Sequence, residues 1–272
     1  MTGASRSNLR LRLLTAAVVV PLLLYMLFVG PGWLLPSATV LVASLGALEL
    51  AAMVAPGQRL YALYGLLATW TVLALVSARL PDGAWLPVLV LLPVVGMLVT
   101  LVRPEPIETA GVRTGFALGG PLYLGVLFGL VVKLFEREYG GAWVLVVMVC
   151  AFLSDTGAYF AGRAFGRRKL HERVSPKKTI EGAIGGLLAA LVGVLLVRAF
   201  LLPVLPLWGA IPLSLVAAAL GQLGDLSESM IKRSTGVKDS GDLLPGHGGI
   251  LDRTDALVFC AAAVWLYAEY LM

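Results

Sequence analysis

Long apolar segments, separated by short stretches rich in Gly and Pro, follow one another along almost the whole chain. Hydropathy separates about nine segments of roughly the 20 residues that a helix needs to cross a bilayer. They lie near residues 13–30, 34–55, 60–78, 84–102, 116–134, 143–161, 180–201, 206–225 and 252–271. With 59% hydrophobic residues and a mean hydropathy of +0.90, the sequence predicts an all-α polytopic integral membrane protein. Two pairs of neighbouring segments are also compatible with single kinked helices, so the predicted number is about eight to ten.

The distribution of Lys and Arg predicts the orientation. With nine segments, the N-terminus and the connections at 56–59, 103–115, 162–179 and 226–251 share one side of the membrane. Only four of the 21 Lys and Arg residues fall on the other side: Arg79, Lys133, Arg137 and Arg198. Cytoplasmic loops carry the excess of positive charge. We therefore expect a multi-pass protein of the plasma (inner) membrane with its N-terminus and its charged loops in the cytoplasm.

Polar groups are distributed unevenly between the two halves of the chain. Residues 1–142 are expected to form N-terminal transmembrane helices that provide scaffold, dimer contacts or lipid access. Residues 143–272 are expected to form a C-terminal catalytic region, with the site at the cytoplasmic ends of its helices. Glu49 is the main polar group inside the first half, and we expect an interface position or a hydrogen bond to a neighbouring helix. Cys150 and Cys260 lie in apolar stretches and are expected to pack in the core.

A group of charges begins at the end of the eighth apolar segment. If that helix continues, Asp225, Ser229, Lys232 and Arg233 fall at i, i+4, i+7 and i+8 on one face, with Glu228 beside them. A carboxylate, a hydroxyl and two cations at a membrane edge suit a metal ion and a phosphate together. The alternative interpretation is a helix end whose charges pair with one another and extend towards water.

A glycine-rich loop follows, and its glycines allow backbone N–H groups to approach an anion closely. The loop contains Lys238, Asp239 and His247; a lone His here either donates to a phosphate or has a structural role. Asp252 and Asp255 follow as i, i+3 neighbours at the start of the last segment, where acids also suit the helix dipole. Hard oxygen ligands favour Mg²⁺, whereas no His and Cys cluster supports zinc.

The sixth apolar segment also carries polar groups. Asp155 and Tyr159 are i, i+4 neighbours, and an acid inside an apolar helix is a candidate functional residue. A basic run, Arg167, Arg168 and Lys169, lies just beyond its end. Such cations are typical of contacts with lipid head groups on the cytoplasmic side.

The segment around residue 175 predicts a second helix start. Ser175 before Pro176 is typical of an N-cap followed by proline at the first helical position. That arrangement would place Lys177 and Lys178, with the N–H groups of the first turn, around an anion. Anchoring of lipid head groups is the alternative for these two lysines.

Both polar segments resemble phosphatidate cytidylyltransferases, also called CDP-diacylglycerol synthases. The family signature is matched by the fixed positions Ser229-x-Ile231-Lys232-Arg233-x4-Lys238-Asp239-x-Gly241-x2-Leu244-Pro245-x-His247-Gly248-Gly249-Ile250-x-Asp252-Arg253-Thr254-Asp255. The stretches around Asp155–Tyr159 and Ser175–Gly182 are also similar, so the resemblance covers about residues 150–272. The N-terminal half is similar in hydropathy alone.

This resemblance implies that CTP and phosphatidate react to give CDP-diacylglycerol and pyrophosphate, in phospholipid biosynthesis. It also implies a polytopic dimeric fold and dependence on Mg²⁺. The aspartates matching Asp225 and Asp252 are those expected to hold the metal centre. A second cation such as K⁺ beside the magnesium is a further implication of the resemblance.

The mechanism expected from charge is an attack of the ionised lipid phosphate on the α-phosphorus of CTP, helped mainly by positioning and neutralisation. The residues predicted to act in catalysis are Lys232, Arg233, Lys238, Asp239, His247 and Asp255. Those predicted to bind substrate are Asp155, Tyr159, Ser175, Lys177, Lys178, Ser229 and Arg253. Those predicted to bind metal are Asp225 and Asp252.

Two other functions remain open from the sequence. A CTP-dependent kinase of polyprenol or phytol needs the same phosphate and metal groups. A transporter would use the charges as an ion pathway, although they gather at one membrane face and no inverted repeat is visible. A CDP-alcohol phosphotransferase is disfavoured because its Asp and Gly pattern is missing. The expected partners are CTP, phosphatidate, the bilayer and a second copy of the chain; nucleic acid is not expected.

Overall fold

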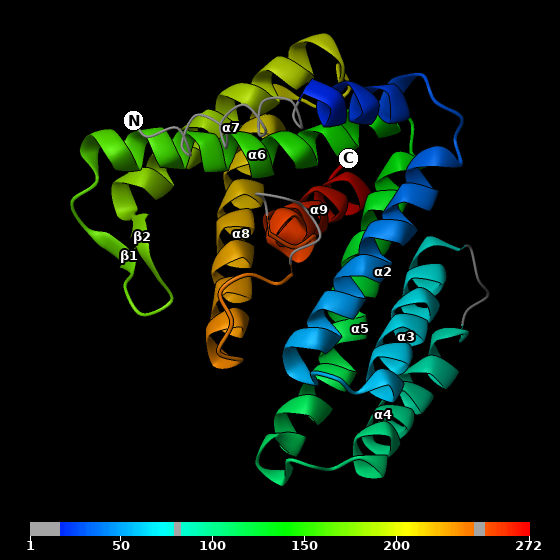
Figure 1. Cartoon of the computed structure of the whole chain (residues 1–272). Helices are drawn as coiled ribbons and strands as arrows, with labels where there is room; N and C mark the ends of the chain where they lie inside the picture. Colours follow the sequence, from blue (N-terminus) through cyan, green and yellow to red (C-terminus); the bar gives the residue numbers. More distant parts are fainter. Residues whose placement is uncertain (1–16, 79–82, 242–247) are drawn as a thin grey trace.

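The computed structural model describes residues 17–78, 83–241 and 248–272 of the chain, which are mostly helical (Figure 1). A short apolar helix at Ala17–Phe28 comes first. The elements that follow are α2 (Leu34–Val54), α3 (Arg59–Ser77), α4 (Trp85–Val102), the 3-10 turn η1 (Ile107–Thr109), α5 (Ala110–Phe135), α6 (Gly140–Phe165), β1 (Lys169–His171), β2 (Ser175–Thr179), α7 (Ile180–Phe200), α8 (Leu207–Ser234) and α9 (Leu251–Tyr270).

Seven helices in the described ranges are long and apolar enough to cross a membrane, namely α2 to α8, with η1 continuing into α5. The prediction of an all-α membrane protein is therefore confirmed, apart from one small hairpin. The helix at Ala17–Phe28 is shorter, and α9 carries charged residues at both ends. The predicted count of nine spans, or eight to ten, thus stays a prediction.

Two apolar cores meet at α9. One contains side chains of α6, α7, α8 and the Ala17–Phe28 helix, including Trp143, Val147 and Val194. The other contains side chains of α2, α3 and α5, including Val72 and Leu124. Helix α9 contributes buried residues to both cores, and in Figure 1 it lies between α8 and the α2–α5 group. Because α9 begins at the predicted site, packing on both sides fixes where that site forms.

Helices α6 and α7 pack against each other closely along their length. A Cβ added at Gly157 would lie 2.5 Å from Ala189 Cβ and 2.7 Å from the carbonyl oxygen of Gly185. In membrane helices, where no hydrophobic effect drives the pairing, small residues allow the backbones to approach and pack tightly. This contact holds the C-terminal end of α6 beside the start of α7, and the hairpin β1–β2 connects the two (Figure 1).

Candidate active site

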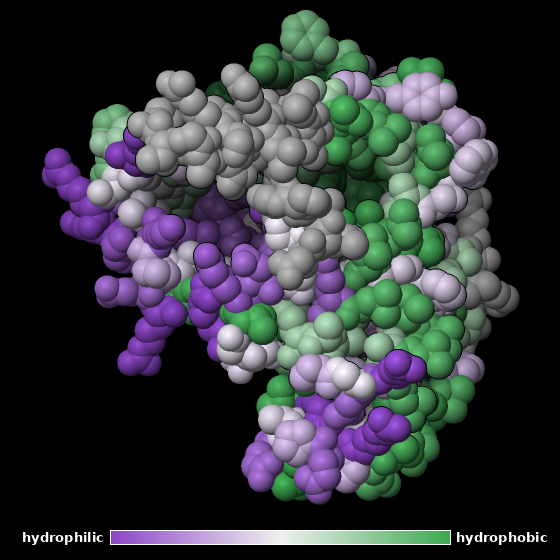
Figure 2. Space-filling model, viewed as in Figure 1, coloured by the Kyte–Doolittle hydropathy of each residue, from purple (hydrophilic) through white to green (hydrophobic). Residues whose placement is uncertain are grey.

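Residues from five elements surround a cavity of about 440 Å³, and its polar side chains come from α6, β2 and α8. It is lined by Asp155, Ala158, Tyr159, Gly162 and Arg163 of α6, by Leu170 of β1, by Lys177, Lys178 and Thr179 of β2, by Gly182 and Ala183 of α7, and by Gln222 and Asp225 of α8. Figure 2 shows hydrophilic residues gathered in the region of the β1–β2 hairpin. The cavity thus brings together five residues predicted from separate parts of the sequence: Asp155, Tyr159, Lys177, Lys178 and Asp225.

The predicted helix start at Ser175 is wrong. Ser175 lies in strand β2 and pairs with His171 of β1, in an antiparallel hairpin with a register irregularity. A proline without an N–H is tolerated in such an edge strand. Helix α7 begins instead after Thr179, whose Oγ1 accepts a hydrogen bond from the N–H of Gly182 at 3.1 Å. A hydroxyl side chain does cap this helix, as predicted, but it belongs to Thr179, four residues after Ser175.

A second contact ties the hairpin to α7. Glu181, in the first turn of α7, accepts hydrogen bonds from the N–H groups of Arg167 and Arg168, at 3.0 and 3.2 Å. An acid in this position also suits the positive end of the helix dipole. The basic run thus belongs to the base of the hairpin. Its backbone fixes the path of the strand that carries Lys177 and Lys178.

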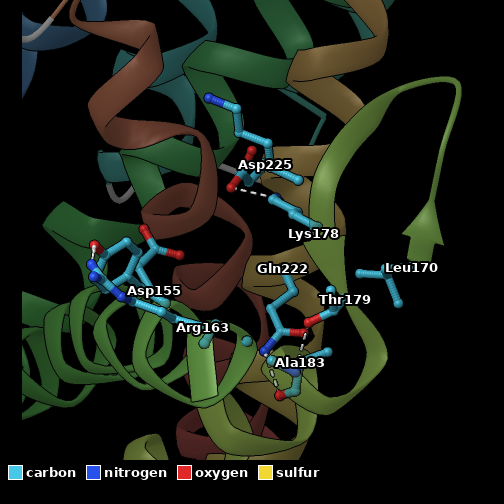
Figure 3. A pocket seen from close by; sticks show the side chains of 13 residues that line it. Asp155, Arg163, Leu170, Lys178, Thr179, Ala183, Gln222 and Asp225 are labelled. Atoms are coloured by element: carbon cyan, nitrogen blue, oxygen red, sulfur yellow. Dashed lines mark hydrogen bonds and ion pairs between the residues drawn. The ribbon is translucent and has the colours of Figure 1, made fainter. Parts of the chain in front are cut away.

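The shortest charged contact across the cavity joins β2 to α8. Lys178 Nζ lies 2.5 Å from Asp225 Oδ2 (Figure 3). The other oxygen of Asp225 accepts a weaker hydrogen bond from Ser229, at 3.4 Å. Asp155 lines the same cavity from α6 and is close enough to Asp225 for electrostatic repulsion, with Lys178 as a compensating cation. The cavity therefore contains two carboxylates and a lysine that can exchange partners with an incoming anion or cation.

Gln222 is a lining residue that the sequence did not point to. Its Nε2 donates to Ser154 Oγ of α6 and to the carbonyl oxygen of Ala183 of α7, each at 3.0 Å. It therefore connects α6, α7 and α8, and its contact with Ala183 can be followed in Figure 3. Its position three residues before Asp225, on the same face of α8, is the signal that could have identified it.

A second charged group lies where α8 faces α9. Lys232 Nζ is 2.5 Å from Asp252 Oδ1 and also forms an ion pair with Glu228 Oε2. Glu228 is only 2% exposed, and its other oxygen has no hydrogen-bond partner among the described residues. A buried carboxylate needs such a cation, because charges taken out of water are costly when unpaired. The structure thus pairs the predicted phosphate-binding Lys232 with two acids.

Asp252 is held from both sides. While Oδ1 contacts Lys232, Oδ2 accepts hydrogen bonds from the N–H groups of Gly249 and Ser240, at 2.9 and 3.0 Å. The Ser240 Oγ is also near this carboxylate, at 3.1 Å from Oδ2. Lys232 and the two backbone N–H groups thus fix the orientation of this carboxylate, and the Ser240 hydroxyl lies beside it.

The other predicted residues fall into three groups. Arg233, Lys238, Asp239 and Arg253 are exposed. Arg233 donates a hydrogen bond to the carbonyl oxygen of Val237 at 3.4 Å. Asp255 is buried at 8% exposure between α8 and α9. His247 lies outside the described residues. The predicted common face of α8 therefore extends to Lys232 but does not include Arg233.

The two predicted metal ligands lie in separate ion pairs, Asp225 with Lys178 and Asp252 with Lys232. Among residues 17–78, 83–241 and 248–272, no group of three or more His, Cys, Asp or Glu side chains is arranged to hold a metal ion. The described residues therefore provide two separate candidate ligands for a metal ion, Asp225 and Asp252, each paired with a lysine. They do not form a complete metal site made of protein side chains alone.

Known proteins are similar in sequence to this chain, two of them over more than nine-tenths of its length. Residues 10–271 match the model of the Cytidylyltransferase family. A phosphatidate cytidylyltransferase of Staphylococcus haemolyticus is 34% identical over 92% of this chain and 95% of its own length. A phosphatidate cytidylyltransferase of Brucella suis is 37% identical over 96% of this chain and 93% of its own length. One from Staphylococcus saprophyticus is 43% identical over 53% and 55%. The similarity thus extends well beyond residues 150–272, and the chain belongs to the cytidylyltransferase family.

Proposed function

We propose that this protein is a phosphatidate cytidylyltransferase, which converts CTP and phosphatidate to CDP-diacylglycerol and pyrophosphate. Two relatives with that name align with this chain over nearly their whole length. The observation that supports the proposal is the cavity where lysines of β2 meet carboxylates of α6 and α8. We infer that this cavity opens to lipid head groups on one side and to water-soluble nucleotide on the other.

The chemistry asks the protein to bring two anions together. An oxygen of the lipid phosphate bonds to the α-phosphorus of CTP, while the bond from that phosphorus to the pyrophosphate oxygen breaks and the pyrophosphate leaves with the electron pair. Phosphatidate is already ionised near neutral pH, so no general base is required. Positioning and charge neutralisation then supply most of the rate. We assign Lys177, Lys178 and Arg253 to the lipid phosphate.

The triphosphate is assigned to the other cations, Lys232, Arg233 and Lys238. Arg233 and Lys238 are exposed beside the loop, where a nucleotide can reach them. Lys232 is engaged by Glu228 and Asp252 and acts from the wall of the site. His247, in the same loop, is proposed as a further donor to phosphate.

We infer that Mg²⁺ is held by Asp225 and Asp252, with Asp239 and Asp255 as additional acids. Magnesium is usually bound by one or two carboxylates together with substrate phosphates, and Asp225 and Asp252 are the carboxylates that would provide these ligands. A magnesium ion held by these acids would supply positive charge for the reacting phosphates. Lys178 and Lys232, which balance these acids in the structure, would then be available to bind phosphate. A second cation such as K⁺ is part of the same proposal.

The experiment that tests the function follows the phosphorus of CTP. Purified protein in detergent with phosphatidate is given CTP labelled at the α-phosphorus. Label in a lipid product, with unlabelled pyrophosphate released, supports the cytidylyltransferase. With polyprenol or phytol supplied as acceptor, label that remains in CDP identifies a CTP-dependent lipid kinase. Uptake by protein reconstituted into vesicles, without any turnover, identifies a transporter. Either of these two results overturns the proposal.

We further propose that the β1–β2 hairpin faces the cytoplasm. Both native cysteines are buried, so an introduced cysteine is expected to react alone with a membrane-impermeant maleimide. Glu172→Cys, between β1 and β2, should be labelled in inverted vesicles and protected in intact cells. Glu138→Cys, exposed at the opposite end of α6, should behave in the reverse way. Labelling of Glu172→Cys in intact cells would contradict the orientation.

A further inference from the structure

Glu49 of α2 contacts the charged loop from the far end of the sequence. Its Oε1 accepts a hydrogen bond from the N–H of Ile250 and its Oε2 from the N–H of Leu251, each at 2.9 Å. Ser240 Oγ lies 3.0 Å from Oε2. The expectation of a hydrogen bond to a neighbouring helix is thus confirmed, and the neighbour is the start of α9.

This carboxylate satisfies donors that the helix itself leaves free. The first N–H groups of a helix have no partner within it, and a negative charge there is favoured by the helix dipole. Glu49 takes the N–H groups of residues 250 and 251, whereas Asp252 takes that of Gly249. Two acids, one from α2 and one from α9, therefore divide the donors at the start of α9.

The two acids also share the Ser240 hydroxyl. Its oxygen lies 3.0 Å from Glu49 Oε2 and 3.1 Å from Asp252 Oδ2. One hydroxyl has one proton, so it donates to one acid at a time. Whether Glu49 accepts the Ser240 proton therefore decides whether Asp252 can accept it.

Two glycines of the loop leave room for this carboxylate. A Cβ at Gly241 would lie 2.8 Å from Glu49 Oε1, and a Cβ at Gly249 would lie 2.7 Å from Oε1 and 2.5 Å from Oε2. Real Cβ atoms essentially never come so close to another atom. At Gly249 the added Cβ would also lie 2.1 Å from Ser240 Oγ, so Gly241 leaves room for Glu49 and Gly249 leaves room for both Glu49 and Ser240.

We propose that Glu49 is a positioning residue, which fixes the turn at residues 248–251 and the shared Ser240 hydroxyl so that Asp252 faces the site. The inference rests on the proposed function, in which Asp252 takes part in the reaction. It also gives the N-terminal helices a defined role, because α2 supplies the group that orients the loop without touching either substrate.

The test compares Glu49→Gln with Glu269→Gln as a matched control. Gln keeps the shape but replaces one oxygen by an amide that faces an N–H donor. Glu269 is paired with Arg137 at the other end of the same α9. We expect Glu49→Gln to lower kcat about 10- to 100-fold, with the KM for CTP little changed, whereas Glu269→Gln keeps wild-type kcat. A wild-type kcat in Glu49→Gln overturns the inference.

A second readout does not depend on turnover. Hydrogen–deuterium exchange at the amides of residues 249–252 should be faster in Glu49→Gln than in wild type, and unchanged in Glu269→Gln. Unchanged exchange in Glu49→Gln would also overturn the inference. If wild-type protein makes no CDP-diacylglycerol but exchange responds as expected, the function fails while the contact made by Glu49 stands.

Ser240→Ala keeps the inference testable if Glu49→Gln does not fold. It removes only the shared hydroxyl and should lower kcat on its own. Where Glu49→Gln does fold, the two effects in the double variant should be less than multiplicative, because both act through Asp252. Wild-type kcat in Ser240→Ala, or fully multiplicative losses in the double variant, would count against the positioning role.

Discussion

Asp252→Asn is expected to lower kcat about 1000-fold in a protein that remains folded. The substitution keeps the size of the side chain but removes the charge that faces Lys232 and replaces one acceptor oxygen by a donor. Oδ2 now receives N–H groups from Ser240 and Gly249, so an amide nitrogen on that side would meet two donors. Asp225→Asn is expected to have a similar effect, since that carboxylate faces Lys178 across the cavity.

The measurement is turnover of CTP with phosphatidate, beside the melting temperature of each variant in the same detergent. Glu138→Gln, an exposed acid in the α5–α6 connection, is the control and should keep full activity. A near-normal rate in Asp252→Asn or Asp225→Asn would refute their assignment to the metal ion.

Lys232→Met is expected to give the largest loss of stability together with loss of turnover. Removing the cation leaves Glu228 and Asp252 facing each other at the α8–α9 contact without a counterion. Breaking a buried ion pair in this way typically costs about 3–5 kcal/mol of unfolding free energy. The measurement is the melting temperature in detergent and the rate of CDP-diacylglycerol formation.

A double variant separates the two losses. Glu228→Gln added to Lys232→Met removes the more buried of the two charges, which is 2% exposed, and should recover much of the melting temperature. Turnover should stay low, because the cation assigned to the phosphates is still missing. If the double variant recovers activity along with stability, Lys232 has a structural role alone.

The apolar lengths of the helices could be predicted from the sequence because a bilayer-spanning helix needs a long run of apolar residues. Where a helix continues beyond its apolar segment, hydropathy predicts an end that comes too early. The eighth segment was predicted to end near residue 225, but α8 continues to Ser234. Its last turns carry charges that face other helices, so they are polar and still helical.

The hairpin and the pairing of charges could not be predicted in the same way. Strands of three and five mostly polar residues have no extended apolar alternation. The Ser175-Pro176 pair is a more typical N-cap signal than Thr179, so the sequence predicted the helix start there. The Lys178–Asp225 contact joins residues far apart in the chain. Residue types and spacing indicated which groups belong to a site, whereas only the packing of α6 to α9 decides which of them touch.

The contact between Glu49 and the start of α9 also bears on how the protein is made. Helix α2 enters the membrane long before α9 is synthesised, because 201 residues separate Glu49 from Ile250. Until α9 arrives, the carboxylate lacks the donors that it has in the finished protein, and a lone acid in a membrane helix is unfavourable. A chain that stalls before α9 therefore leaves the Glu49 carboxylate without the two N–H partners that α9 provides.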